Sequence, residues 1–342
     1  MAVLVTGGAG YIGSHAVQRL LRDGQRVVAF DNLYRGHEAA LRLLKPSGGG
    51  SLTFVKGDIT DRALLERVMK ENAVDSVMHF AALAYVGESV DDPLFYYHNN
   101  VTGTISLLNA CKAAAVSKFV FSSSCSTYGQ PAPEYIPVPE TTPQSPLSPY
   151  GRSKWHCEHI IGDFAESMSR AGTPFGFANL RYFNVCGCDR SGVLGEDHTP
   201  ETHLIPVVVE AALGRRENIA IFGTDYSTTD GTCIRDYVHV EDLVDAHVKV
   251  MSVLKPGDRL AYNLGIGKGY SVREIIQAVR EVSGREFKVI EHPRRAGDVA
   301  ALYSNPAKIQ SELGWRAQVT DLHEIIRSAY RWFEKHPKGY RS

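Results

Sequence analysis

A tyrosine and a lysine four residues apart, Tyr150 and Lys154, are well placed to do acid–base chemistry. On a helix, residues four apart share a face, so the ammonium group would lie beside the phenol. A free tyrosine has a pKa of about 10 and is a poor base at neutral pH. A neighbouring cation stabilises the phenolate and lowers this barrier to ionisation. The pair therefore predicts proton transfer to or from a substrate hydroxyl group.

A run of serines could supply a third polar group to the same site. Ser124 closes the segment Phe121-Ser122-Ser123-Ser124, at the end of a predicted strand over 119–122. Open α/β sheets bind ligands at the carboxyl ends of their strands, so we expect Ser124 to orient the reacting hydroxyl group. The alternative is that Tyr150 and Lys154 form an ordinary pair on a surface helix. Their combination with the serines and with a dinucleotide motif favours catalysis.

That motif is a glycine-rich loop near the N-terminus. Gly7, Gly10 and Gly13 follow a predicted strand at 3–5 and open a predicted helix at 12–23. Glycines at such positions allow a tight turn, close approach of the backbone to a pyrophosphate, and close packing of the helix on the sheet. The spacing differs slightly from the commoner Gly-x-Gly-x-x-Gly, and a purely structural turn is the alternative.

Three further positions support dinucleotide binding. Asp31 ends the second predicted strand, where a carboxylate can accept hydrogen bonds from the adenosine ribose and repel a 2′-phosphate. This favours NAD over NADP, although Arg35 lies close enough to soften the preference. Asp58, after the third predicted strand, could meet the adenine ring or cap the next helix. Phe80-Ala81-Ala82 ends the fourth strand with small residues that would let the chain pass close under the cofactor.

The elements that must position these residues alternate between strands and helices. Short apolar runs separated by helical patterns imply parallel pairing with right-handed crossovers. The predicted fold class is therefore α/β, with a doubly wound (Rossmann) parallel sheet. The predicted strands cover 3–5, 26–31, 52–55, 76–80, 119–122 and 176–182, and the longest predicted helices between them cover 99–115 and 150–169.

The second half of the chain is less regular and predicts a smaller, interleaved C-terminal α/β substrate domain. We expect an NAD-binding domain over 1–185, rejoined by about 236–265, and a substrate-binding domain over 186–235 and 266–342. A proline-rich ordered loop is expected at 129–149 and a polar loop at 186–203. Helices are expected near 204–214, 241–252, 271–283 and 320–335, and a strand near 219–222.

The composition excludes several classes of protein. The 342 residues include 37 basic and 38 acidic side chains, so no excess of positive charge exists to neutralise a nucleic acid. The longest apolar stretches fall far short of the roughly 20 residues that cross a bilayer, and the first residues lack the features of a signal peptide. We expect a soluble protein with neither a nucleic-acid nor a membrane partner.

The six cysteines are too sparse for a disulfide scaffold and fit a reducing cytoplasm. Cys186 and Cys188 are a candidate metal-binding pair. They are separated by a single residue and no second pair follows, whereas zinc ligands usually have wider spacing and a partner pair. We predict small apolar loop residues here and no metal.

The glycine loop, Asp31, Ser124 and the Tyr150–Lys154 pair together resemble the extended short-chain dehydrogenase/reductase superfamily. Within it, the chain is most similar to the UDP-glucose 4-epimerase family, over motifs that run from the first strand nearly to the end. The resembling stretches are Val5–His15, His79–Ala82, Val86–Ser89, Arg181–Asn184, Ala220–Gly223, Asp230–His239 and Pro293–Asp298.

The resemblance implies tightly bound NAD, a UDP-sugar substrate and a homodimer. Arg235 and Arg295 offer forked donors to a pyrophosphate, although each could instead form a surface ion pair. The implied cofactor contacts are Gly7, Gly10, Tyr11, Ile12, Gly13, Asp31, Asn32, Asp58, Ile59, Phe80, Ala81, Ala82, Asn99, Tyr150, Lys154 and Phe183. The implied substrate contacts are Ser124, Asn184, His203, Leu204, Ala220, Phe222, Arg235, Arg295, Asp298 and Leu302.

In the reaction implied by the resemblance, Tyr150 takes the proton of the sugar 4-hydroxyl while C4 gives a hydride to NAD. The 4-keto sugar then turns over, and the hydride returns to its other face. A 4,6-dehydratase is the rival enzyme, but its Asp-Glu pair is replaced here by Cys125-Ser126-Thr127. A dinucleotide-sensing regulator would be expected to have lost Tyr150 or Lys154.

The choice of sugar stays open between hexoses, pentoses and N-acetylhexosamines. Ala84 stands where hexose epimerases of the family carry lysine, and Ala84-Tyr85 resembles the plant-type UDP-arabinose (UDP-xylose) 4-epimerases. Leu302 falls at the family's gatekeeping position for C2 substituents, and His203 replaces a usual asparagine. We expect hexoses to turn over best, with some tolerance of pentoses. The helices at 99–115 and 150–169 would pair across the two-fold axis of the homodimer.

Overall fold

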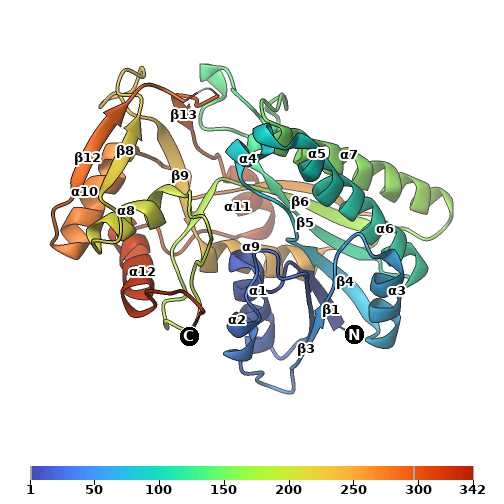
Figure 1. Ribbon diagram of the computed structural model, residues 1–342. Coiled ribbons are helices and arrows are strands. Elements are labelled where there is room, and N and C mark those ends of the chain that lie inside the picture. The colour runs from blue at the N-terminus through green and yellow to red at the C-terminus, as the bar shows by residue number, and fades with distance from the viewer. Residues whose placement is uncertain (1, 296, 342) are drawn as a thin grey trace. The chain divides into compact units, whose positions relative to one another are not determined.

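The computed structural model describes residues 2–295 and 297–341, which fall into two compact units (Figure 1). The first unit is built from the chain up to Gly129, from Pro143–Arg181 and from Val244–Tyr262. The second is built from Gln130–Thr142, from Tyr182–Leu243 and from the chain beyond Asn263. Ala296, inside the resembling stretch Pro293–Asp298, lies outside the described residues.

A seven-stranded sheet forms the centre of the first unit, in the order β10-β6-β5-β4-β1-β2-β3 (Figure 1). The pairings along β3-β2-β1-β4-β5 are parallel, which confirms the doubly wound fold class. The strands are β1 (Ala2–Thr6), β2 (Arg26–Asp31), β3 (Ser51–Lys56), β4 (Val74–His79), β5 (Lys118–Ser124), β6 (Gly176–Tyr182) and β10 (Arg259–Leu264).

The helices of this unit pack their apolar faces on the sheet. One hydrophobic cluster joins Leu65 of α3, Leu107 of α6 and Ile161 of α7 to Phe30 and Phe119 of the strands. The helices are α1 (Tyr11–Arg22), α2 (Glu38–Arg42), α3 (Arg62–Glu71), α4 (Val86–Asp91), α5 (Pro93–Tyr96), α6 (Gly103–Ala113), α7 (Pro149–Arg170) and α9 (Val240–Val253), whose first residues belong to the second unit.

The predicted helix at 99–115 differs from the structure at its start. A π-helical segment, η1 (Tyr97–Thr102), precedes α6 without a break in the helix. Within it, the Asn100 side chain accepts from the backbone N–H of Leu83 (2.8 Å) and donates to the Leu83 carbonyl (3.0 Å) and the Ser153 hydroxyl (2.9 Å). The wider turn thus ties α7 to the segment that follows β4. Such turns are frequent at functional sites.

A buried ion pair anchors α7 to the sheet. Arg181 of β6 donates to Glu158 of α7 at 2.6 Å, and the two side chains are 10% and 4% exposed. Ser123 of β5 donates to the same carboxylate at 2.5 Å, and Arg181 also donates to the Tyr128 hydroxyl at 3.0 Å. Two strands and one helix are therefore held in register by one carboxylate.

The second unit contains a four-stranded sheet and a separate parallel pair of strands. Strands β7 (Asn184–Cys186), β9 (Ile234–His239), β11 (Gly269–Ser271) and β13 (Ala301–Leu302) form the sheet, and β8 (Asn218–Phe222) pairs with β12 (Lys288–His292). The helices are α8 (Leu204–Ala212), α10 (Val272–Ser283), α11 (Ala307–Leu313) and α12 (Leu322–Lys335). Trp332 and Ile325 of α12 join Ile275 of α10 in their core.

The limits of the two units differ from the predicted domains at the proline-rich loop. Residues 130–142 belong to the second unit, not to the first. Val138 explains the difference, because its backbone forms a bridge with Ser304 and its carbonyl accepts from Asn263 Nδ2 at 2.8 Å. These contacts are long-range and have no signal in local sequence.

The cysteines are free thiols, and Cys186 and Cys188 are both buried. The predicted loop position is right for Cys188 and wrong for Cys186, which ends strand β7. Burial raises the pKa of both thiols, which disfavours the thiolate form that binds metals. Among the described residues, no helix combines the length and hydropathy needed to cross a membrane.

The Glu158–Arg181 pair generates a stability prediction. Glu158→Gln leaves the Arg181 guanidinium buried without its counter-charge, so we expect the free energy of unfolding to fall by about 3–5 kcal/mol in chemical denaturation. Glu166→Gln is the matched control on the same helix, because Glu166 is 43% exposed and pairs with Arg170 at the surface. Equal unfolding midpoints for the two variants would contradict a stabilising role for the buried pair.

Candidate active site

The glycine loop connects β1 to α1 in a turn that has no room for a side chain at Gly7 or Gly13. Gly7 has φ +70°, and a Cβ there would lie 2.7 Å from the backbone nitrogen of Ala81. A Cβ on Gly13 would lie 2.0 Å from the Gly7 carbonyl oxygen. The N–H of Gly10 donates to that carbonyl at 3.0 Å and closes the turn. The absence of side chains at Gly7, Gly10 and Gly13 lets an anion approach the backbone N–H groups at the start of α1.

Asp31 lies at the end of β2, as the sequence predicts, and touches this loop directly. Its carboxylate accepts from the N–H of Ala9 at 3.0 Å and from the N–H of Leu33 at 2.8 Å. The side chain is buried, and burial raises the pKa of the carboxyl group. Asp31 therefore fixes the shape of the loop in addition to any hydrogen bond it offers a ligand.

Asp58 and Asn32 lie on neighbouring strand ends and contact one another. The Asn32 side-chain amide donates to Asp58 at 2.9 Å, and Thr60 donates to the other carboxylate oxygen through its N–H and its hydroxyl. Burial would raise the pKa of Asp58, but these hydrogen bonds lower it below its usual value. The alternative in which Asp58 caps the next helix is wrong, because Asp61 is the N-cap of α3.

Arg35 forms an ion pair with Glu88 that the sequence did not reveal. In the sheet, β2 and β4 flank β1, so the loops that follow them lie on either side of the glycine loop. Arg35, after β2, donates to Glu88 of α4 at 2.6 Å and stacks on the Tyr85 ring at 3.8 Å. The Tyr96 hydroxyl donates to the second oxygen of Glu88 at 2.6 Å. Arg35 Nη1 is buried and has no hydrogen-bond partner.

Tyr150 and Lys154 lie in the first turns of α7, which packs against β5, the strand that carries Ser124. Ser148 caps α7 by accepting from the N–H of Gly151 at 3.1 Å, and this start places Tyr150 in the first turn of the helix. Ser124 is the last residue of β5. All three proposed catalytic side chains are buried, between 3% and 7% exposed. The predicted strand end and helix start are both confirmed.

Lys154 is held from below by the sheet. Its Nζ donates to the Ser122 carbonyl at 2.7 Å and lies 4.9 Å from the centroid of the Phe121 ring. Burial lowers the pKa of Lys154 to about 8, and Cys157 and Glu158 act in the opposite direction. The ammonium is thus present at neutral pH but close to its titration point, in a setting where its field on a neighbouring phenol is strong.

The remaining residues predicted to bind a cofactor divide between the units. Phe183 belongs to the second unit, whereas the others belong to the first. Asn99 lies in η1, where its side-chain amide donates to Asn100 at 2.9 Å, and Phe80 packs on His247. The first unit therefore contains Gly7, Gly10, Tyr11, Ile12, Gly13, Asp31, Asn32, Asp58, Ile59, Phe80, Ala81, Ala82, Asn99, Tyr150 and Lys154.

Of the residues predicted to bind the substrate, all but Ser124 lie in the second unit. Arg295 donates to Asp298 at 2.9 Å and stacks over the Phe222 ring at 4.7 Å. Arg235 lies 3.7 Å from the same carboxylate and is paired in register with Leu302. The ion-pair alternative for the two arginines therefore has support, since both contact Asp298.

The other four substrate residues have different surroundings. Asn184 lies on β7, Ala220 on β8 and Leu204 at the first position of α8. His203 precedes α8, and its N–H and Nδ1 each lie 2.8 Å from the carboxylate of Glu201. One ring nitrogen of His203 is thus directed into the protein and not towards a ligand.

Comparison with known proteins places this geometry in a family. A family model described as GDP-mannose 4,6 dehydratase matches residues 4–329. The chain is 48% identical to a probable UDP-arabinose 4-epimerase 1 of Oryza sativa subsp. japonica, over 99% of this chain and 80% of that protein. It is 46% identical to a UDP-glucose 4-epimerase of Halalkalibacterium halodurans, over 99% and 98%. The crystal structure of UDP-glucose 4-epimerase from Bifidobacterium longum in complex with NAD+ and UDP superposes with a TM-score of 0.92, at 40% identity over 99% and 100%.

The glycine loop generates a binding prediction. Gly13→Ala forces a Cβ against the Gly7 carbonyl, so we expect the unaltered chain to retain a dinucleotide through gel filtration and the purified variant to lose it. Gly162→Ala in α7 is the matched control, because nothing lies within 4 Å of its added Cβ. The control should keep the dinucleotide and gain up to about 1 kcal/mol of stability. A full equivalent of dinucleotide on Gly13→Ala would contradict the prediction.

Proposed function

Because this chain belongs to the extended short-chain dehydrogenase/reductase superfamily, in the group of the UDP-glucose 4-epimerases, we propose that it inverts the configuration at C4 of a UDP-sugar with a bound NAD. The observation that carries the proposal is the burial of Tyr150 and Lys154 at the start of α7, next to a strand that ends at Ser124, in the unit that holds the glycine loop. The names of the similar proteins support the same reaction.

The residues of the first unit fit NAD. Gly7 and Gly13 keep the start of α1 bare, so backbone N–H groups can face a pyrophosphate. Arg35 Nη1 is a buried donor without a partner, which suits a phosphate oxygen. When bound, NAD supplies the oxidant that takes up and returns the hydride of C4.

The chain's own residues handle the proton. Tyr150, as phenolate, accepts the proton of the sugar 4-hydroxyl and later returns it. Lys154 stabilises the phenolate, and its bond to the Ser122 carbonyl fixes the ammonium in place. Ser124 hydrogen-bonds the reacting oxygen through its hydroxyl, which already accepts from the N–H of Ser126 at 3.1 Å. Its own proton thus remains available for donation.

Residues of the second unit would hold the nucleotide. We propose that Arg235 and Arg295 bind the pyrophosphate, and that Asp298 accepts from the ribose hydroxyls once the arginines turn to the ligand. Phe222, 36% exposed, offers a ring face in the same group. Inversion requires that the nucleotide is held firmly and the 4-keto sugar loosely, so that its other face can be presented.

A dehydratase is the rival enzyme, and the matching family model carries a dehydratase's name. Elimination across C5 and C6 needs an additional acid and base beside the reacting hydroxyl group. Ser124 is followed by a 3-10 turn, Cys125–Thr127, that contains no carboxylate. The buried side chains of this turn, Cys125 and Thr127, are a thiol and a hydroxyl group and not carboxylic acids. These residues favour epimerisation.

A second candidate substrate is a UDP-pentose. Its support is the 48% identity to a probable UDP-arabinose 4-epimerase and the alanine at position 84. Leu302 is 8% exposed and is smaller than the tyrosine that excludes N-acetyl groups in the family. We propose UDP-glucose and UDP-galactose as the preferred substrates, with UDP-arabinose and UDP-xylose as slower ones. UDP-N-acetylglucosamine is the third candidate, and the size of Leu302 decides whether its N-acetyl group fits.

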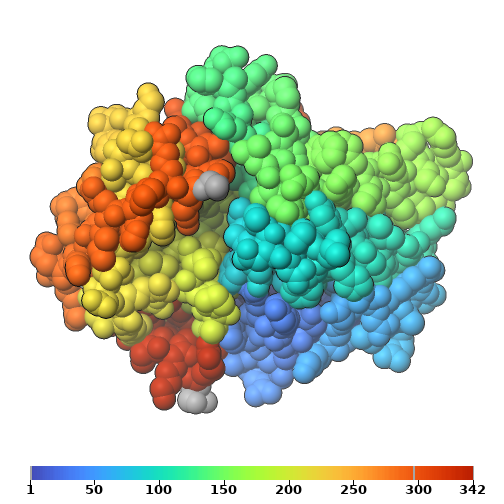
Figure 2. All heavy atoms as spheres, turned by 45° about the horizontal axis from the view of Figure 1, so that its top comes forward, coloured from blue at the N-terminus to red at the C-terminus, as the bar shows by residue number. Residues whose placement is uncertain are grey.

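We further propose a homodimer that works in the cytoplasm. Helices α5 and α7 contact one another and form one continuous surface in Figure 2. This region exposes Leu94 (77%) on α5 and Ile105 (42%) on α6, which are unusual surface residues that a second copy would cover. Six free thiols suit a reducing compartment. Light scattering during gel filtration measures the assembly, and a monomer at micromolar concentration would contradict the dimer.

The lowered pKa of Lys154 gives a pH prediction: kcat should fall as the pH rises through about 8, because deprotonation removes the cation beside Tyr150. The effect on stability has the opposite sign. In the unfolded chain a lysine titrates near about 10.4, so between pH 8 and 10 the unfolded state binds the extra proton and this group favours folding as the pH rises. Circular dichroism at each pH therefore separates lost catalysis from unfolding.

Lys154→Arg is the informative variant for the pH profile, because a guanidinium stays charged over the whole range. Whatever its absolute rate, its alkaline limb should move upward from that of the unaltered enzyme. An alkaline limb at the same pH in both proteins would show that another group causes it.

The function itself is tested by incubating the purified chain with UDP-galactose, UDP-arabinose or UDP-N-acetylgalactosamine, with no added NAD. We expect UDP-glucose to form fastest, UDP-xylose more slowly, and both without release of reduced cofactor. Leu302→Tyr should abolish any turnover of the N-acetylated sugar and leave the hexose reaction within a few-fold. Equal or greater kcat/KM for UDP-arabinose would overturn the hexose preference, and no conversion of any UDP-sugar would defeat the proposed function.

A further inference from the structure

A loop of the second unit gathers four metal-binding side chains that the proposed reaction does not use. Glu196, His198, Glu201 and His203 lie between β7 and α8. One ligand atom from each side chain lies within 4.8 Å of all the others. The donor set, two imidazoles and two carboxylates, is one that zinc accepts in proteins. His203 is also one of the residues expected near the nucleotide.

The four nitrogen–oxygen distances within the cluster are close to the distances between neighbouring ligand atoms around a small ion. Nδ1 of His198 lies 3.1 Å from Oε1 of Glu196 and 3.4 Å from Oε2 of Glu201. Nδ1 of His203 lies 3.2 Å from Oε1 of Glu196 and 2.8 Å from Oε1 of Glu201. Nitrogen and oxygen ligands about 2.0–2.2 Å from a tetrahedral zinc ion are about 3.3–3.5 Å apart. The four ligand atoms all lie within 4.8 Å of one another, so the more distant pairs would approach by up to about 1.3 Å around the ion.

The charge of the cluster also calls for a partner. The side chains of Glu196 and Glu201 are only 3% and 4% exposed, and two buried carboxylates need two positive charges nearby. Either two protonated imidazoles or one divalent cation with two neutral imidazoles supplies them. Oε2 of Glu201 is buried, and its 3.4 Å contact with Nδ1 of His198 lacks the geometry of a hydrogen bond, so an ion between the two groups would satisfy this oxygen.

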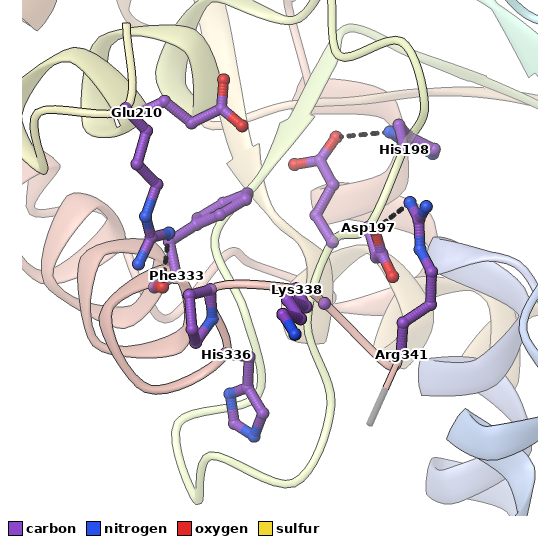
Figure 3. A pocket seen from close by; sticks show the side chains of 11 residues that line it. Asp197, His198, Glu210, Phe333, His336, Lys338 and Arg341 are labelled. Atoms are coloured by element: carbon purple, nitrogen blue, oxygen red, sulfur yellow. Dashed lines mark hydrogen bonds and ion pairs between the residues drawn. The ribbon is translucent and has the colours of Figure 1, made fainter.

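Nearby arginines are engaged with other groups (Figure 3). Arg341 reaches Asp197, and Arg215 donates to the Phe333 carbonyl at 2.7 Å. Arg216 binds the side chain of Glu210 and the backbone carbonyl of Glu201, and not its carboxylate. Figure 3 shows His198 turned towards the carboxylate of the cluster. These three arginines therefore do not pair with the carboxylates of the cluster.

The loop is held in this shape independently of an ion. The N–H groups of Thr202 and His203 donate to Oε1 of Glu201 at 2.7 and 2.8 Å, which orients this carboxylate. Trp332 of α12 donates to the Glu196 carbonyl at 3.2 Å and packs against Gly195, where a Cβ would lie 2.1 Å from its ring. Preorganised ligands of this kind raise the affinity of a metal site.

We propose that Glu196, His198, Glu201 and His203 form a structural site for one divalent transition-metal ion, with zinc as the best fit. Four protein ligands leave no open position, so the ion would stabilise the fold and not act on a substrate. It would fix the entry to α8, whose first residue, Leu204, is among the proposed nucleotide contacts. The site stands whether or not the chain is an epimerase, because its ligands lie outside the Tyr150–Lys154 machinery.

The test begins with the unaltered full chain. After treatment with a chelator and gel filtration, the protein is loaded with Zn²⁺ or Co²⁺, passed through a second column, and its metal content is measured by mass spectrometry. We expect one equivalent of metal per chain, a Co²⁺ absorption spectrum typical of four-coordinate N/O ligation, and a higher thermal midpoint with Zn²⁺ than without. Two side-chain changes, His198→Gln and Glu201→Gln, should each remove the bound equivalent.

His323→Gln is the matched control, because His323 lies at the surface, where it pairs with Glu281 at 2.6 Å and with Asp321 at 3.5 Å, and it should contribute no metal. Failure of the unaltered chain to retain either metal, with a thermal midpoint that Zn²⁺ and chelator leave unchanged, would overturn the proposal and identify the cluster as a proton-balanced ion-pair network. A retained equivalent in both His198→Gln and Glu201→Gln would overturn it as well, because the ion would then lie elsewhere.

Discussion

The burial of one ammonium group is the constraint on which the candidate active site depends. Lys154 is 3% exposed, and a charge taken out of water at that depth is costly unless it is held by polar groups. The Ser122 carbonyl and the face of Phe121 supply such groups from β5. The same desolvation makes the ammonium act strongly on whatever lies beside it, because the local dielectric is low. Desolvation of the ammonium is therefore the cause both of the free-energy cost of burying Lys154 and of its strong effect on a neighbouring phenol.

The rest of α7 is arranged to keep that group in place. Ser148 fixes where the helix begins, and Glu158, one turn beyond Lys154, fixes its body against β5 and β6 through Ser123 and Arg181. Asn100 in η1 then ties the same helix, at Ser153, to the segment after β4. A helix held at three levels cannot rotate without breaking buried polar contacts. This framework positions Tyr150 in the first turn of the helix.

The sequence revealed those parts of the fold that depend on local patterns. Apolar runs identify β1 to β6 because strands covered on both faces need such runs, and the glycine spacing, Asp31 and Ser124 fall where short-range signals place them. The π-turn at Tyr97–Thr102 was missed because its residues read as ordinary helix. Strand β10 was missed because its apolar run, 260–262, is short and is flanked by Arg259 and Asn263.

Long-range contacts account for the other omissions. The Arg35–Glu88 ion pair joins the loop after β2 to helix α4, and nothing in either segment alone predicts the partner. Val138 joins the second unit through Ser304, far along the chain. The cluster at 196–203 is local in sequence but was missed: Cys186 and Cys188 were the candidate metal pair, and the prediction was no metal. Burial raises the pKa of both thiols. Mixed histidine–glutamate spacing was the signal that could have found it.

The central claim is that the Tyr150 phenol transfers the proton during inversion at C4. The most direct measurement is the rate of conversion of UDP-galactose by Tyr150→Phe, on protein whose NAD content is assayed in the same sample. The account predicts a full equivalent of NAD and a loss of at least about a thousand-fold in kcat, the scale expected for removal of a general base. Conversion at close to the unaltered rate would contradict it.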